Sequence, residues 1–103
     1  MGERMAFQVV WSDAAIADLE SISAFIAERN PDAALRVGRR ILEHTRLLRE
    51  FPMIGPEYPR GSGGPLREIV CRPYRIFYDV SESTRRVEVL HVWHGARPEP
   101  DFE

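Results

Sequence analysis

The spacing of apolar residues changes from helical to strand-like between residues 50 and 66, and that change constrains the fold more than any other feature. Between residues 13 and 50, apolar side chains recur every three or four positions, which is the spacing of amphipathic helices. From residue 66 to 93, β-prone residues alternate with polar ones, which is typical of strands. In a chain of 103 residues, too short for two separate cores, this order predicts one α+β domain spanning residues 1–103.

Two helices are predicted in the first half. The first covers residues 13–29 and follows Ser12, a favourable N-cap. Asn30 and Pro31 then separate it from a second helix over residues 31–50, because proline suits the first helical position. Such a short connection predicts an antiparallel hairpin. The apolar residues expected to face the core are Ala15, Leu19, Ile22 and Ile26, widened by Ile16 and Phe25, and then Ala34, Val37, Ile41 and Leu48, with Leu35 and Leu42 beside them.

Four strands are predicted around this hairpin. One covers residues 6–11, and three more cover residues 66–71, 74–80 and 86–93. Short turns join the last three, which predicts an antiparallel meander with the helices packed on one face of the sheet. Residues 52–65 hold four prolines and four glycines, so we expect an irregular loop there.

Composition excludes several classes of protein. Hydrophobic residues make up 44% and charged residues 29%, which is typical of a globular domain and not of a disordered one. No segment approaches the roughly 20 apolar residues that span a bilayer, and no signal peptide is evident, so we expect a cytoplasmic protein without a membrane partner. Cys71 is the only cysteine, which excludes an internal disulfide and a cysteine metal cluster.

Charge is small overall but uneven. The chain has 14 basic residues, all of them arginine, against 16 acidic residues, for a net charge of −2. Whole-molecule charge therefore gives little attraction to nucleic acid. Residues 60–97 hold seven arginines against four carboxylates, a local charge of +3, and the last six residues carry −3. A GC-rich genome is one explanation for arginine without lysine; the alternative is a role for arginine in binding planar carboxylates or phosphates bidentately.

Two charged residues of the strand over residues 74–80 are predicted to lie away from the helices. Alternation directs Arg75 and Asp79 to that face, where Arg67 or Glu68 of the preceding strand would join them. Such cross-strand charges form either an ordinary solvated surface or a binding site, and the pattern leaves both open. The other assignments are Tyr74, Ile76, Tyr78 and Val80 toward the helices, and Phe77 toward the open face.

Histidines lie at the end of the last strand. His91 and His94 are three positions apart, so a strand directs them to opposite faces, and we expect no metal site. His94 and Arg97 together offer a proton acceptor and a cation that could act on a phosphate. The alternative is a strand-end histidine bonded to the backbone.

Four motifs lie in order along nearly the whole chain, and together they resemble the RelE/ParE family of toxins from bacterial type II toxin–antitoxin modules. They are Trp11-Ser12-x-x-Ala15-x-x-Asp18-Leu19-x-x-Ile22, Phe51-Pro52-x-Ile54-Gly55, Pro73-Tyr74-Arg75-Ile76-Phe77-Tyr78 and His91-x-x-His94-Gly95-Ala96-Arg97. The resemblance implies the same order of strand, helices and strands, a role in growth inhibition and plasmid stabilisation, and no cofactor.

Within this family, the resemblance implies two modes of action. ParE-like members inhibit DNA gyrase by protein contact, whereas RelE-like members are endoribonucleases that cleave mRNA in the ribosome. The cleavage mode would use Arg67, Arg75, His94 and Arg97, with Glu68 as a spare base, and would make the chain an enzyme. The gyrase mode would use Arg75, His94 and Arg97 as target contacts. The absence of lysine, the negative net charge and the His-Gly-Ala-Arg ending favour the gyrase mode.

The resemblance also implies a cognate antitoxin as partner. Family antitoxins wrap a disordered or helical segment around the toxin, and we expect the helices and a sheet edge to form the groove. The DNA-reading element belongs to the antitoxin, so we expect no direct sequence-specific DNA binding by this chain. A third possibility is a module that binds its antitoxin but has lost its toxicity.

Overall fold

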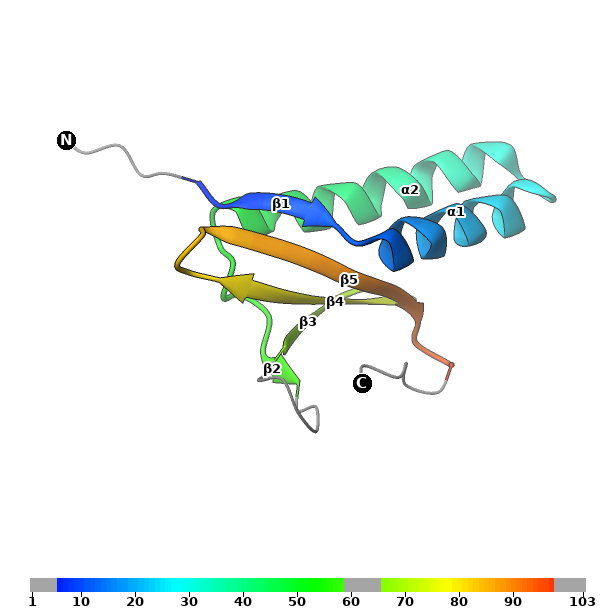
Figure 1. The fold of residues 1–103 in the computed structure, drawn as a ribbon. Coiled ribbons are helices and arrows are strands. Elements are labelled where there is room, and N and C mark those ends of the chain that lie inside the picture. Colours follow the sequence, from blue (N-terminus) through cyan, green and yellow to red (C-terminus); the bar gives the residue numbers. More distant parts are fainter. Residues whose placement is uncertain (1–5, 59–65, 98–103) are drawn as a thin grey trace.

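Two helices cover one face of a five-stranded mixed sheet (Figure 1). The computed structural model describes residues 6–58 and 66–97. Strand order is β1-β5-β4-β3-β2, with β1 parallel to β5 and every other pair antiparallel. The elements are β1 (Gln8–Trp11), α1 (Asp13–Ala27), α2 (Pro31–Arg46), the 3-10 helix η1 (Leu47–Arg49), β2 (Glu57–Tyr58), β3 (Leu66–Cys71), β4 (Tyr74–Ser81) and β5 (Arg86–His94). The predicted α+β class, the helical hairpin and the β3-β4-β5 meander are confirmed.

Both predicted helix caps are present. The Ser12 hydroxyl accepts the N–H of Ala15 at 3.0 Å and donates to the carbonyl of Leu90 at 3.0 Å, so this residue both starts α1 and ties it to β5. Asn30 accepts the N–H of Ala33 through Oδ1 at 3.0 Å, and Pro31 follows at the first position of α2. These caps satisfy donors that the first turn of a helix leaves without partners.

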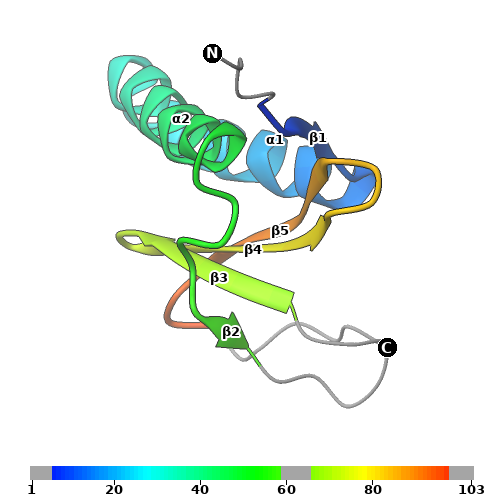
Figure 2. The ribbon, with the colours of Figure 1, turned by 90° about the vertical axis from the view of Figure 1, so that its left-hand side faces the viewer.

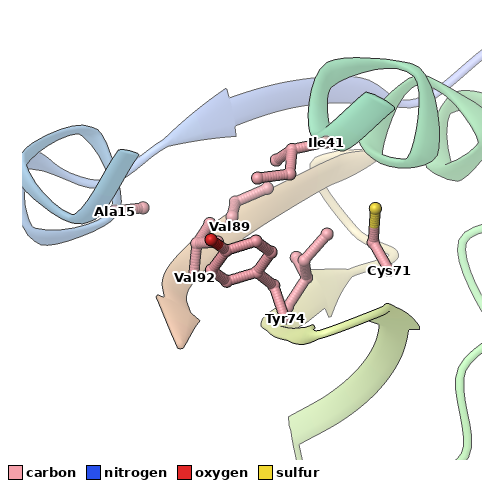
Figure 3. Packing of buried hydrophobic residues seen from close by; sticks show 7 residues of the cluster. Ala15, Ile41, Cys71, Tyr74, Val89 and Val92 are labelled. Atoms are coloured by element: carbon pink, nitrogen blue, oxygen red, sulfur yellow. The ribbon is translucent and has the colours of Figure 1, made fainter. Parts of the chain in front are cut away.

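The main core lies between the helices and strands β4 and β5. Figure 3 shows Ala15 and Ile41 of the two helices facing Tyr74, Val89 and Val92 of the sheet. Ala15 is completely buried, and its small side chain lets α1 lie close to β5. A second cluster contains Leu48, Tyr78 and Val87.

The buried face of each helix is narrower than its apolar stripe in the sequence. Phe25 and Leu35 are 76% and 66% exposed, because the loop end of the hairpin extends beyond the strands (Figure 1). Ile16 and Leu42 also remain largely exposed on the flanks of their helices. The expectation that Ile16 and Phe25 widen the buried stripe of α1 is therefore wrong, and Leu35 and Leu42, which the sequence places beside the buried face of α2, lie outside the core. Ala34 and Ile41 on α2 and Leu48 on η1 are buried as predicted.

Two short elements were not predicted. The strand β2 lies inside the segment expected to be irregular, and η1 replaces the last turn of the second predicted helix. Figure 2 shows β2 at the edge of the sheet beside β3, on the side away from the helices. The ring of Tyr58 in β2 packs edge to face on Phe77, with centroids 5.2 Å apart, so Phe77 is fully buried although it faces away from the helices.

The Tyr78 hydroxyl holds the segment that leads from η1 to β2. It donates to the carbonyl of Pro52 at 2.8 Å and accepts the N–H of Gly55 at 3.0 Å. A Cβ at Gly55 would lie 2.6 Å from the carbonyl oxygen of Glu68, so this close approach requires glycine. Within residues 6–58 and 66–97, neither helix is long and apolar enough to cross a membrane.

Removing the Tyr78 hydroxyl should destabilise the fold. Tyr78→Phe leaves the Gly55 N–H and the Pro52 carbonyl without their partner, and we expect a loss of about 1–3 kcal/mol in the free energy of unfolding, measured in urea. Tyr74→Phe is the control, because no residue in the described ranges hydrogen-bonds to the Tyr74 hydroxyl. Equal losses in the two variants would contradict this role of Tyr78.

Stability should also fall in alkaline solution. Burial raises the pKa of Tyr78, against smaller opposing effects of its hydrogen bond to Gly55 and of Arg67, and burial also raises the pKa of Tyr74. A raised pKa means that the folded state holds the tyrosine proton more tightly than the unfolded state does. The contribution of the protonated tyrosines to the free energy of unfolding is therefore complete below about pH 10 and is lost at higher pH. Urea unfolding between pH 8 and pH 11 should show this fall, and the fall should be shallower for Tyr78→Phe.

Candidate functional site

Strand register places one group of charged and aromatic side chains on the sheet face turned away from the helices, which we call the open face. Arg75 pairs with Trp93, while Phe77 pairs with both Glu68 and His91. Since paired residues share a face, these five side chains lie on the open face. This group consists of Glu68, Arg75, Phe77, His91 and Trp93, joined by Tyr58 of β2 and by Arg97 just beyond β5. Asp79, paired with Glu88, lies on the same face, as predicted.

Arg75 is held in an ion pair with Glu68. Its Nε lies 2.5 Å from Oε2 of Glu68 and its Nη2 lies 3.4 Å from Oε1, so the contact is bidentate. The two side chains are only 20% and 19% exposed. The guanidinium also stacks over the rings of Phe77 and Tyr58, at 5.0 Å and 5.7 Å from their centroids. Arg75 therefore organises the open face, and Glu68 neutralises its charge.

Arg67 anchors the segment that precedes β2. Its Nη1 donates to the carbonyls of Gly55 at 2.7 Å and Met53 at 3.3 Å, and its Nη2 lies 3.6 Å from a carboxylate oxygen of Glu57. Glu68, and not Arg67, is therefore the β3 residue that joins Arg75.

His94 lies on the opposite side of the sheet from Arg75. It pairs with Tyr74, a residue of the helix-side core, and the two rings meet edge to face with centroids 5.6 Å apart. Its Nδ1 accepts the backbone N–H of Ala96 at 3.1 Å. This geometry matches the alternative of a strand-end histidine bonded to the backbone.

Arg97 stacks on Trp93. The guanidinium carbon lies 4.0 Å from the ring centroid, which is close for a cation–π contact. The turn beneath it is fixed by two backbone hydrogen bonds, from Gly95 to the Pro73 carbonyl at 2.7 Å and from Arg97 to the His94 carbonyl at 3.0 Å. Among residues 6–58 and 66–97, no carboxylate pairs with the Arg97 guanidinium.

Asp18 of α1 is a further residue of this region, and its role is not predicted by the sequence. Its Oδ2 accepts the backbone N–H of Val92 and lies 3.0 Å from Nδ1 of His91. The last residue of β1, Trp11, pairs with Val89. Beyond that point α1 lies along the outer edge of β5, where Asp18 accepts the backbone N–H of Val92. One signal was available: Asp18 interrupts the apolar stripe next to Leu19, where a charge needs a specific partner.

The structure thus does not gather Arg67, Arg75, His94 and Arg97 into one cluster. Arg67 binds loop carbonyls, Arg75 binds Glu68, His94 lies on the helix side and Arg97 lies on Trp93. Within the described ranges, no group of three or more histidine, cysteine or acidic side chains is placed to hold a metal ion.

Two apolar grooves lie on either side of the end of α2. The larger, of about 620 Å³, lies between β1 and α2, and its lining includes Val9, Trp11, Leu42, Arg46 and Arg49. The smaller, of about 370 Å³, lies between η1 and β3, where Leu47, Ile54 and Val70 are each at least half exposed. These surfaces can bind an apolar segment of a partner protein.

Comparison with known proteins identifies the family. Residues 9–99 match the family described as the ParE toxin of the type II toxin–antitoxin system parDE. The chain is 36% identical over 91 residues to toxin RelE2 of Caulobacter vibrioides, covering 87% of this chain and 97% of that protein. It is also 36% identical over 95 residues to the putative toxin Y4kP of Sinorhizobium fredii, covering 90% and 93%.

Solved structures show the same fold. A chromosomal ParDE toxin–antitoxin system from P. aeruginosa contains a chain with a TM-score of 0.70 at 21% identity, covering 86% of this chain and 96% of that one. The RelBE2 toxin–antitoxin complex of Mycobacterium tuberculosis gives a TM-score of 0.67 at 21% identity, covering 86% and 98%. Sequence and fold agree: the chain belongs to the RelE/ParE family of toxins from type II toxin–antitoxin systems.

Proposed function

We propose that this toxin inhibits DNA gyrase by protein–protein contact and that a cognate antitoxin neutralises it. The observation that carries the proposal is the pairing of Arg75 with Glu68 on one side of the sheet while His94 lies on the other. Metal-free RNA cleavage requires a base, an acid and cations around one phosphate. The arrangement of these three residues favours a binding surface over such a centre.

Charge supports the same mode of action. A net charge of −2 gives little long-range attraction to ribosomal RNA, whose phosphates bind proteins mainly through many cations. The matched family description names the ParE toxin, which agrees with a gyrase inhibitor. The name of the relative RelE2 keeps mRNA cleavage as the second candidate, in which Arg67, Arg75, His94 and Arg97 would act on RNA.

The groove between β1 and α2 is the proposed binding site for the antitoxin. Its walls are apolar at Val9, Trp11 and Leu42, and Arg46 and Arg49 lie at its rim. β1 is the edge strand of the sheet, and its residues Gln8, Val9 and Trp11 line this groove. A segment with apolar residues on one side and carboxylates on the other would match this chemistry.

Induction of this chain in bacteria without its antitoxin should separate the two modes of action. We expect growth arrest together with a strong DNA-damage response, because gyrase trapped on cleaved DNA leaves broken strands. Purified toxin should correspondingly inhibit supercoiling by purified gyrase.

Growth arrest without DNA damage, accompanied by cleaved mRNA on ribosomes, would contradict the gyrase proposal. In that case Arg75→Ala and His94→Ala should abolish cleavage while leaving antitoxin binding nearly intact. An absence of growth arrest, with antitoxin binding retained, would instead identify a toxin that has lost its activity.

Placing a negative charge in the groove should weaken antitoxin binding. We expect Leu42→Glu and Arg46→Glu each to raise the Kd for the cognate antitoxin by at least about tenfold, measured by calorimetry. Leu35→Glu and Arg39→Glu are matched controls, because both residues are exposed on α2 outside the lining of this groove. Equal losses in the controls would point to a general charge effect and overturn the assignment.

A further inference from the structure

We propose that Trp93 and Arg97 form the contact point through which this toxin binds a carboxylate-bearing surface of its target protein. The inference rests on the proposed inhibition of gyrase and names the residues and the chemistry that would carry it. Neither residue is needed by the hydrophobic core, since Arg97 is exposed and Trp93 is half-buried on the open face.

Trp93 is held in place before any partner arrives. The ring of His91 meets it edge to face with centroids 5.4 Å apart, and His91 is fixed in turn by Asp18 at 3.0 Å. On the other side, Trp93 pairs with Arg75, which its bidentate contact with Glu68 holds in position. A large aromatic side chain that is already ordered loses little conformational entropy on binding.

Arg97 is similarly prepared to bind an anion. The backbone hydrogen bonds of Gly95 and Arg97 fix the turn, and the guanidinium carbon lies over the Trp93 ring, 4.0 Å from its centroid. Stacking uses the face of the guanidinium and leaves the N–H groups at its edge able to bind a carboxylate bidentately. Arg75 is unsuited to this role because Glu68 already occupies its edge.

A protein surface fits this site better than nucleic acid. Binding to a phosphate backbone depends on several cations acting together, whereas Arg97 is one cation beside the neutralised pair of Arg75 and Glu68. Tryptophan and arginine are enriched among the few residues that dominate protein–protein binding energy. The chemistry therefore points to an acidic protein surface that can accommodate an indole ring.

The test is the inhibition of supercoiling by purified DNA gyrase, measured with the full chain. We expect Trp93→Ala and Arg97→Glu each to raise the concentration for half-maximal inhibition at least about tenfold. Arg97→Lys should give a smaller loss, because it keeps the charge but not the flat, bidentate group. Arg86→Glu is the matched control, since Arg86 is exposed at the other end of the same strand.

Fold and antitoxin binding are checked for each variant by thermal unfolding and calorimetry. If Trp93→Ala does not fold, Arg97→Glu still decides the outcome, because Arg97 is exposed and lies beyond β5. Unchanged affinity for the antitoxin, with weaker inhibition of gyrase, would support the inference.

Three outcomes would overturn it. Wild-type inhibition by both variants would reject Trp93 and Arg97 as the contact while leaving the gyrase proposal intact. An equal loss of antitoxin affinity would assign this surface to the antitoxin, and weaker binding of Arg97→Glu to a fluorescent DNA duplex would assign it to nucleic acid. A wild-type chain that does not inhibit gyrase would instead reject the proposed function itself.

Discussion

Strand β5 is the element on which the rest of the structure depends, because it connects the two ends of the described chain. On one side it pairs in parallel with β1, and on the other it pairs antiparallel with β4. Two polar side chains reinforce this connection, Ser12 at the Leu90 carbonyl and Asp18 at the Val92 N–H. The helices can cover the sheet only because these contacts hold the start of α1 against β5.

A second constraint shapes the open face. Tyr78 and Gly55 fix the segment after η1, which lets β2 join β3 and lets Tyr58 cover Phe77. Arg75 then lies over both rings and binds Glu68. An arginine that looks available for chemistry in the sequence therefore serves to order its neighbours, whereas Arg97 on Trp93 is an exposed cation beside them.

Local signals in the sequence were enough to predict most of the fold. Ser12 and Asn30 mark both helix starts, and alternation in residues 74–80 assigns Tyr74, Arg75 and Ile76 to the correct faces. The two-residue strand β2 carries too few residues for a periodic pattern. Likewise, the apolar stripe of α1 marks Asp18 only as a charge in an unusual place; its partner His91 lies 73 positions away, and local spacing does not identify it. Exposure of Phe25 and Leu35 depends on where the sheet ends beneath the hairpin, which helix periodicity does not reveal.

The order of elements also has a consequence for synthesis. The hairpin of α1 and α2 contains mostly local contacts and is complete before β3, β4 and β5 leave the ribosome. Until β5 arrives, Ala15 and Ile41 have no sheet to cover them, and Trp93 and Arg97 are not yet in place beside Arg75. The growing polypeptide is therefore first an exposed apolar hairpin, and the surface proposed to poison the cell is assembled only in the last stage of folding.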